Sequence, residues 1–162
     1  MQQLHIFLAD LDDPAHARAV CELTQIYAID PMGNGKPLDD DVMERLIPGL
    51  RRHPTTRIFL VFDGEHAVGI ATCFLGFSTF AARPLINIHD LAIVPDYRGH
   101  GLAKKLLRVI ESYARQVDCC KITLEVVENN RRARAVYEQF GFAQAVYGES
   151  DSGALYYAKD LS

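Results

Sequence analysis

One short segment restricts the fold of this chain more than any other, because it joins a strand, a glycine-containing loop and an amphipathic helix. The segment runs from Ile88 to Ala103. Its glycines, Gly99 and Gly101, allow a tight turn that leaves backbone N–H groups uncovered. The helix that follows adds unpaired N–H donors and a partial positive charge, and the small Ala103 permits close approach of a ligand. The segment therefore predicts a pyrophosphate-binding turn.

Three phosphate-binding patterns can be compared with this turn. A P-loop needs Gly-Lys-Ser/Thr after its last glycine, whereas this chain has Gly101-Leu102-Ala103. The dinucleotide fingerprint needs a third glycine where Lys104 stands. The spacing Arg98-x-x-Gly101-x-Ala103 resembles the coenzyme A pyrophosphate loop of the GNAT family of N-acetyltransferases. Taken alone, these positions fit a plain strand-to-helix turn equally well.

A second block strengthens this resemblance. Residues 130–142 are similar to the later signature of the same family, in which Asn-x-x-Ala is followed by Tyr and then by Gly-Phe. The matching positions here are Asn130, Ala133, Tyr137 and Gly141-Phe142. Both blocks follow predicted strands in the expected order. The resemblance covers residues 85–142 well, whereas the first half of the chain matches only in its order of elements.

Periodicity and turn residues predict the remaining elements. No repeat, low-complexity tract or linker divides the chain, so one domain over residues 1–162 is expected. The expected strands are 4–8, 58–62, 67–74, 85–94 and 122–127, the expected helices are 12–28, 39–50, 101–117 and 131–140, and residues 142–147 and 155–158 are expected to form a closing hairpin.

The resemblance implies the fold. It is the single-domain acyl-CoA N-acyltransferase fold, of the α/β (α+β) class, with a mixed, twisted sheet flanked by helices on both faces. Two parallel strands, 85–94 and 122–127, would splay apart so that the coenzyme enters between them.

The resemblance also implies a site for acetyl-CoA as the co-substrate, with no metal. The strand before the turn would present backbone groups to the pantetheine arm, and the turn would cradle the pyrophosphate. Asn130 would hydrogen-bond the arm, although asparagine is also a good helix N-cap. Tyr137 would lie near the sulfur. The expected coenzyme-binding residues are Leu91, Ala92, Ile93, Arg98, Gly99, His100, Gly101, Leu102, Ala103, Asn130 and Tyr137.

Acetyl transfer to an amine needs a group that takes the amine's proton and benefits from a donor to the departing thiolate. Tyr137 is preferred for the second role because a phenol is a neutral donor near pH 7; the alternative is a core aromatic, spaced with Ala133 and Phe140. The adjacent pair His89 and Asp90 offers two candidate bases, and their side chains point to opposite faces unless a bulge intervenes. Glu125 is a third candidate, and Asp90 is preferred. No acetylated nucleophile stands out, so direct transfer in a ternary complex is expected.

The acceptor is less constrained. Residues 76–80 and 88–91 resemble the diamine acetyltransferases, in which a tandem acidic pair binds the polyamine. Here the first acidic position is His89, which leaves polyamine specificity open. The family shapes its acceptor pocket in the loop at 27–37, whose glycines indicate either mobility or an ordinary connector. The expected acceptor is a primary amine of a small, polyamine-like or diamine-like molecule; the alternatives are a protein or peptide acceptor, or a non-catalytic acyl-CoA-binding regulatory module. The expected acceptor-binding residues are Tyr27, Asp30, Asp90 and Glu125.

Composition argues against several other classes. The formal net charge is -4 and no long run of Lys or Arg occurs, so a nucleic-acid partner is not expected. No signal-peptide pattern and no apolar run of membrane-spanning length is found. Cys21 and Cys73 stand alone, Cys119 and Cys120 are adjacent, and no CxxC pair occurs, which favours reduced thiols. We expect a cytoplasmic enzyme with no membrane partner that forms a homodimer, as family members often do.

Overall fold

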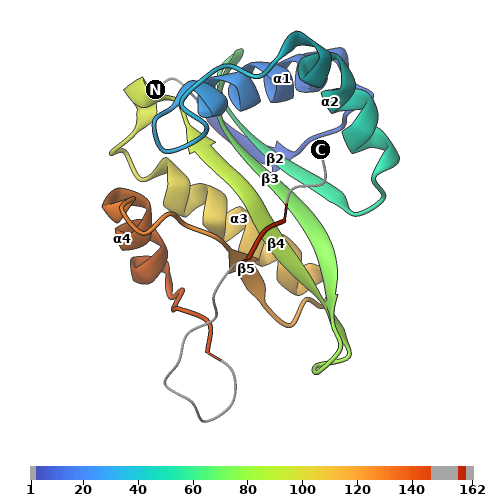
Figure 1. Ribbon diagram of the computed structural model, residues 1–162, viewed down its shortest axis with the longest axis vertical. Helices are drawn as coiled ribbons and strands as arrows, with labels where there is room; N and C mark the ends of the chain where they lie inside the picture. Colours follow the sequence, from blue (N-terminus) through green and yellow to red (C-terminus); the bar gives the residue numbers. More distant parts are fainter. Residues whose placement is uncertain (1–2, 147–156, 160–162) are drawn as a thin grey trace.

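A single mixed sheet organises the chain (Figure 1). The computed structural model describes residues 3–146 and 157–159. Five strands lie side by side in chain order; neighbours are antiparallel except the last two, which are parallel. The strands are β1 (Leu4–Leu8), β2 (Thr56–Asp63), β3 (His66–Ser78), β4 (Arg83–Ile93) and β5 (Ile122–Leu124).

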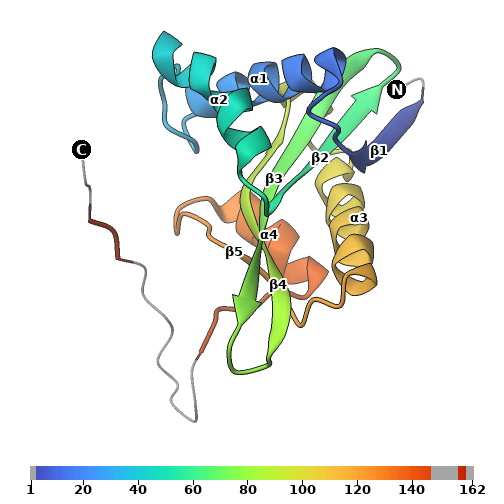
Figure 2. The same cartoon turned by 90° about the vertical axis from the view of Figure 1, so that its right-hand side faces the viewer.

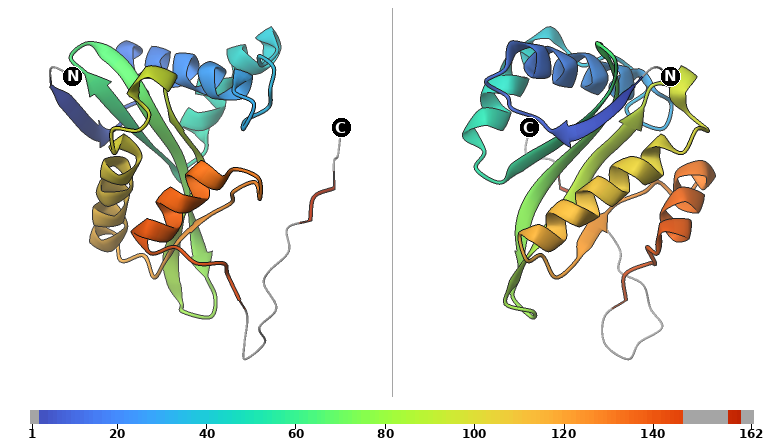
Figure 3. Two further views of the ribbon diagram at one scale, coloured as in Figure 1. Left: turned by 90° about the vertical axis from the view of Figure 1, so that its left-hand side faces the viewer. Right: turned by 180° about the vertical axis from the view of Figure 1, so that it is seen from behind.

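Helices cover both faces of this sheet, as predicted (Figures 1 and 2). Helices α1 (Pro14–Ile29) and α2 (Asp40–Arg52) lie on one face, and α3 (Leu102–Gln116) lies on the other. Helix α4 (Arg131–Phe140) lies beside α3 (Figure 3). Between β4 and α3, the residues Pro95–Tyr97 form one 3₁₀ turn, η1.

Two apolar clusters result from the alternation of side chains along the strands. Phe59 and Val61 of β2 pack into the cluster beneath α3, whereas Ile58 and Leu60 pack into the cluster beneath α1. All four side chains are buried, so the strand reads as continuously hydrophobic. Helix α3 contributes one stripe at helical spacing, formed by Leu102, Leu106, Leu107, Ile110 and Ala114.

Strand β5 and helix α4 are less well buried than the central strands of the sheet. None of the residues of α4 is fully buried, and the three residues of β5 are half-buried. Helix α4 begins at Asn130, whose side chain accepts a hydrogen bond from the Ala133 N–H at 3.1 Å, and it ends at Gly141 with φ 104°. Its ends are therefore well capped even though its packing is shallow.

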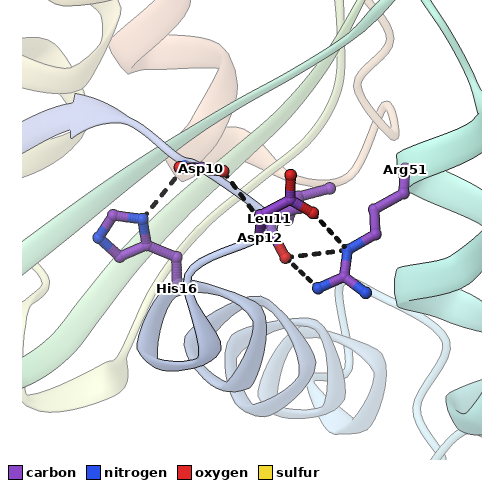
Figure 4. Close-up of polar contacts among 5 residues, drawn as sticks. All are labelled: Asp10, Leu11, Asp12, His16 and Arg51. Carbon is purple, nitrogen blue, oxygen red and sulfur yellow. Dashed lines mark hydrogen bonds and ion pairs between the residues drawn. The ribbon is translucent and has the colours of Figure 1, made fainter.

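A polar network joins the turn after β1 to the two helices above the sheet (Figure 4). The Arg51 guanidinium, near the end of α2, donates to the Leu11 carbonyl and lies 3.4 Å from the Asp12 carboxylate. The Asp10 N–H donates to Nδ1 of His16 in α1, at 3.1 Å. Exposed pairs of this kind add little stability, so the network mainly fixes how α1 and α2 lie relative to β1.

One extra residue interrupts the pairing of β3 with β4. Thr72 lies opposite Asp90, but its neighbour Cys73 lies opposite Ile88, which leaves His89 as a bulge on β4. A bulge shifts the alternation of side chains by one residue. The bulge therefore changes which side of the sheet each following residue of β4 faces.

The clusters show this change of side directly. Before the bulge, Ile86 and Ile88 pack beneath α3; after it, Ile93 does so, while Ala92 packs beneath α1. Asp90, two residues before Ala92, shares the α1 side. The ring of His89 lies 5.8 Å from that of Phe74.

The parallel strands separate where the bulge begins. β4 and β5 pair only from Ile86 with Ile122 to Ile88 with Leu124, so the pairing stops at the residue before His89. The predicted strand at 122–127 is therefore wrong in its last three residues, because the partner strand has turned away. The expected splaying of these two strands is confirmed.

Two other predicted boundaries differ from the structure. Strands β3 and β4 form a longer hairpin than expected, because Gly76 and Pro84, which usually weaken strands, are accommodated within it. Of the predicted closing hairpin, residues 147, 155 and 156 lie outside the described residues; residues 142–145 and 157–158 are not strand, and Val146 forms an isolated bridge. Within the described residues, no helix has both the length and the apolar character needed to cross a bilayer.

Truncation of one α3 side chain should test the core. Leu106 is fully buried beneath the sheet, so Leu106→Ala should lower the free energy of unfolding by about 2–5 kcal/mol. The neighbouring Lys105 is exposed, and Lys105→Ala should change it by less than about 0.5 kcal/mol. Chemical denaturation measures both; equal effects would contradict the assignment of this helix face.

Candidate active site

A cavity of about 590 Å³ lies beside the opening between β4 and β5. Its walls come from the end of β4, the turn into α3, residues along the length of α4, and the end of α1 with the segment that follows it. The expected residues Leu91, Ala92 and Ile93 line it, as do Tyr137 and most of the turn. His100 is exposed and does not line it.

The turn into α3 has the geometry of an anion cradle. Gly99 and Gly101 have φ of 82° and 75°, in the left-handed region that favours glycine. Gly101 precedes the first residue of α3 and makes no side-chain cap, and the first residues of that helix, Leu102 and Ala103, line the cavity. Because the first N–H groups of a helix lack intrahelical partners, they can donate to a bound phosphate here.

Basic side chains surround this cradle although the chain as a whole is acidic. Among the described residues that line the cavity, Arg98, Lys104, Arg131 and Arg132 are basic and Asp30 is the single acid. The Lys104 ammonium donates to the Gln139 side chain at 2.6 Å, which joins α3 to α4 at the cavity wall. The sequence analysis named Arg98 but missed Lys104, Arg131 and Arg132, because the net charge of the chain does not show where the fold places individual basic side chains.

A smaller hollow, of about 80 Å³, adjoins the main cavity. The two share Tyr27, Met32, Leu91, Asn130, Ala133 and Tyr137 in their linings, so they lie against each other along these residues. The smaller hollow adds His89, from the bulge, and Glu125, which follows β5 and is exposed. Met32 was not predicted, because nothing in its sequence context distinguishes it from an ordinary loop residue.

Tyr137 lies at the junction of the two hollows. Its ring contacts the Phe142 ring edge-on, with centroids 5.9 Å apart. Burial, with a smaller contribution from Tyr27, raises the pKa of the Tyr137 hydroxyl to about 12. The hydroxyl is thus a neutral hydrogen-bond donor at physiological pH.

The two candidate bases occupy different environments. His89 is exposed and lines the smaller hollow, whereas Asp90 is half-buried and lines neither hollow. Burial raises the pKa of the Asp90 carboxyl, and the adjacent His89 opposes that rise. Burial also raises the pKa of Tyr27, as do the negative charges of Asp90 and Asp30. Asp90 is therefore close enough to Tyr27 and His89 for their charges to interact, although it lines neither hollow.

Asp30 and Arg98 meet across the cavity wall. The Arg98 guanidinium donates to the Asp30 carboxylate at 2.6 Å and to the Ile93 carbonyl at 2.7 Å. The Asp30 carboxylate also accepts the Met32 N–H at 2.8 Å. These contacts, the Met32 hydrogen bond first, lower the pKa of Asp30. Asp30, expected to bind the acceptor, and Arg98, expected to bind the coenzyme, thus form an ion pair with each other.

Asn130 combines the two roles considered from sequence. Its side-chain oxygen caps α4, as described above, and the residue also lines both hollows. The cap occupies the oxygen and leaves the amide N–H₂ as a hydrogen-bond donor. Whether it bonds the pantetheine arm stays a prediction.

The cavity fits the coenzyme expected from sequence. The left-handed glycines have open space where a Cβ would stand, and the basic side chains line the same cavity, so a pyrophosphate can approach the backbone. No cluster of three His, Cys, Asp or Glu that could hold a metal occurs among the residues that the structure describes. A mixed sheet that opens beside such a cradle defines the class: the chain is an acetyl-CoA-dependent acetyltransferase.

Comparison with known proteins places the chain within that class. It matches the acetyltransferase (GNAT) family over residues 20–142. YhfO, an uncharacterized N-acetyltransferase of Bacillus subtilis (strain 168), is 30% identical over 112 residues, which cover 69% of this chain and 70% of YhfO. The thialysine N-epsilon-acetyltransferase of Bos taurus is 30% identical over 79 residues, which cover 49% of this chain and 46% of that protein. The chain belongs to the GNAT family, as its two sequence blocks predicted.

A solved structure confirms the fold. The crystal structure of a possible acetyltransferase from Clostridium difficile 630 superposes on this chain with a TM-score of 0.75. The superposition covers 96% of this chain and 100% of that chain at 18% sequence identity. The predicted acyltransferase fold is therefore confirmed independently of sequence similarity.

The titration of Tyr137 tests its environment. An ordinary tyrosine ionises near pH 10, so a phenol at about 12 remains neutral at pH values where exposed tyrosines have lost their protons. Alkaline absorbance titration of the native protein and of Tyr137→Phe should differ by one step with a midpoint of about 12. A difference step near pH 10 would show that Tyr137 is open to solvent.

Proposed function

We propose that this protein transfers the acetyl group of acetyl-CoA directly to a primary amine of a small molecule. The observation that carries the proposal is that the two hollows share one set of lining residues, Tyr137 among them. The larger has the anion cradle, the smaller has His89 and Glu125, and Tyr137 lies where they meet. A thioester entering from one side and an amine entering from the other would meet at Tyr137.

The hollow on the amine side supports a small acceptor. It measures about 80 Å³, which suits an aliphatic amine better than a folded protein surface. Glu125 on its wall can attract a cationic acceptor. The relative from Bos taurus is a thialysine N-epsilon-acetyltransferase, so an amine at the end of a flexible side chain is a reasonable acceptor class for this chain too.

Two side chains provide the proton transfers in this proposal. His89 lines the amine hollow and takes the proton that the attacking amine must lose. Asp90, placed first from sequence, lies behind it and stabilises the protonated imidazole. The Tyr137 hydroxyl donates its proton toward the departing sulfur. Bound acetyl-CoA supplies the activated acyl group.

The cysteines support direct transfer over an acetylated enzyme. Cys73 is buried beneath the sheet, and burial raises the pKa of its thiol to about 12, which makes it a poor nucleophile. Cys119 and Cys120 precede β5 and line neither hollow. An amine that attacks within a ternary complex needs none of these thiols.

A thiol-release assay tests the proposed function. Wild-type protein with acetyl-CoA should turn over one class in a panel of lysine analogues, diamines, polyamines, aminoglycosides and peptides. Tyr137→Phe should lower kcat by about 10²-fold or more, because the donor is lost while the ring remains. Turnover of peptides alone would contradict the small-molecule acceptor, and failure to bind acetyl-CoA would contradict the proposal as a whole.

Two substitutions separate the candidate bases. His89→Gln should lower kcat/KM by about 10²-fold or more, because the group that faces the amine is lost. Asp90→Asn should lower it by less than about tenfold, because that carboxylate acts through His89. Steady-state kinetics with the best acceptor measures both. A larger loss in Asp90→Asn would reverse the assignment and restore Asp90 as the base.

A further inference from the structure

The ion pair between Asp30 and Arg98 joins two segments that are 68 positions apart in the sequence. Asp30 ends helix α1, and Arg98 opens the turn that cradles the anion. The pair is shielded rather than fully open, since the side chains are 15% and 30% exposed, respectively. At 2.6 Å it is a charge-assisted hydrogen bond, which is stronger than a neutral one.

On one side, Asp30 anchors the segment between α1 and α2. Its carboxylate accepts the Met32 N–H, and its carbonyl accepts the N–H groups of Gly33 and Gly35 at 2.8 and 3.2 Å. A Cβ at Gly33 would lie 2.1 Å from the Tyr27 carbonyl oxygen, so the segment folds tightly against the helix end. Of the two interpretations left open by its glycines, these hydrogen bonds favour an ordinary connector, although residues 31–37 are exposed.

On the other side, Arg98 anchors the cradle. Its Nε donates to the Ile93 carbonyl at the end of β4 while its other nitrogen holds Asp30. One guanidinium therefore joins the end of the strand, the start of the cradle and the end of α1. Tyr27 and Met32, which flank Asp30, line both hollows.

We propose that Asp30 is a positioning residue. Through Arg98 it fixes the position of the coenzyme cradle relative to the segment between α1 and α2, which lines the acceptor side of the site. This inference rests on the proposed function, because it takes the cradle to be the acetyl-CoA site. It assigns to Asp30 a role other than direct contact with the amine. In this proposal the binding of both acetyl-CoA and the amine depends on the ion pair between Asp30 and Arg98, although Asp30 itself need contact neither substrate.

The sign of one substitution distinguishes this role from a simple effect of charge. Asp30 is the acidic side chain among the described lining residues of a cavity for an anionic ligand. By charge alone, Asp30→Asn should tighten acetyl-CoA binding. If the pair holds the cradle, the same substitution should weaken binding. Asparagine keeps a side-chain oxygen for the Met32 N–H, so the substitution removes the ion pair and spares the turn.

The experiment is calorimetric titration of acetyl-CoA into wild type, Asp30→Asn and Asp96→Asn. Asp96 is an exposed carboxylate in η1, two residues before Arg98, so its substitution makes the same change of charge near the site. We expect the Kd of Asp30→Asn to rise about five- to tenfold. We expect Asp96→Asn to leave the Kd unchanged or to lower it slightly.

Kinetics separates positioning from general damage. In Asp30→Asn the KM for the amine should rise with the Kd for acetyl-CoA, while kcat at saturation stays within about twofold, because the reacting groups are intact. The melting temperature should fall by less than about 4 °C. In Arg98→Lys, adding Asp30→Asn should change the Kd less than it does in wild type, because the fork that holds Asp30 is already lost.

Each contrary outcome is decisive. An unchanged or lower Kd in Asp30→Asn, or an equal rise in Asp96→Asn, would overturn the positioning role while leaving the proposed function in place. A loss confined to kcat would also overturn it, because Asp30 would then act on the chemistry. Failure of the wild type to bind acetyl-CoA would overturn the proposed function and this inference together.

Discussion

The bulge at His89 is the local feature on which the site depends. From Ile86 to Ile88, β4 is paired on both of its edges; from His89 onward, the described residues of β5 no longer pair with it. An unpaired strand edge inside a folded protein is unfavourable unless something satisfies its N–H and C=O groups. Here that edge faces the cavity, so a bound ligand with amide groups can complete the hydrogen bonding that β5 no longer provides.

The charge of the cavity differs from the net charge of the chain, because the fold brings basic side chains together there. The chain carries a net charge of -4, yet its cavity gathers four basic side chains around two left-handed glycines. The strong dependence of ion interactions on distance makes this local arrangement, rather than the net charge, decisive for an anionic ligand. The helix terminus adds donors that no side-chain count reveals.

The sequence predicted the elements and the family better than the connections among them. Periodicity located α3 and α4 because their buried or capping positions recur at fixed spacing, and the two glycine-containing blocks predicted the cradle and Tyr137. The sequence did not decide whether a bulge occurs at His89, because the residues His89 and Asp90 are compatible with both a regular and a bulged strand. The end of β5 depended on that bulge. Asp30 and Arg98 are far apart in the sequence, and no local pattern predicts that they pair. The basic residues of the cavity also come from separate elements, so their proximity follows only from the tertiary fold.

The shallow packing of β5 and α4 has a consequence for how the molecule moves. Together they form one wall of the site, since α4 lines both hollows and Leu124 of β5 lines the smaller one; β5 is joined to the sheet by three residue pairs, and α4 has no fully buried residue. Elements held by few buried contacts open at a lower free energy than the core, and their amide hydrogens exchange sooner. A ligand that bridges this wall to the cradle stabilises the closed arrangement by mass action. A bound ligand would therefore also order this wall, and slower amide exchange in α4 would report that the site is occupied.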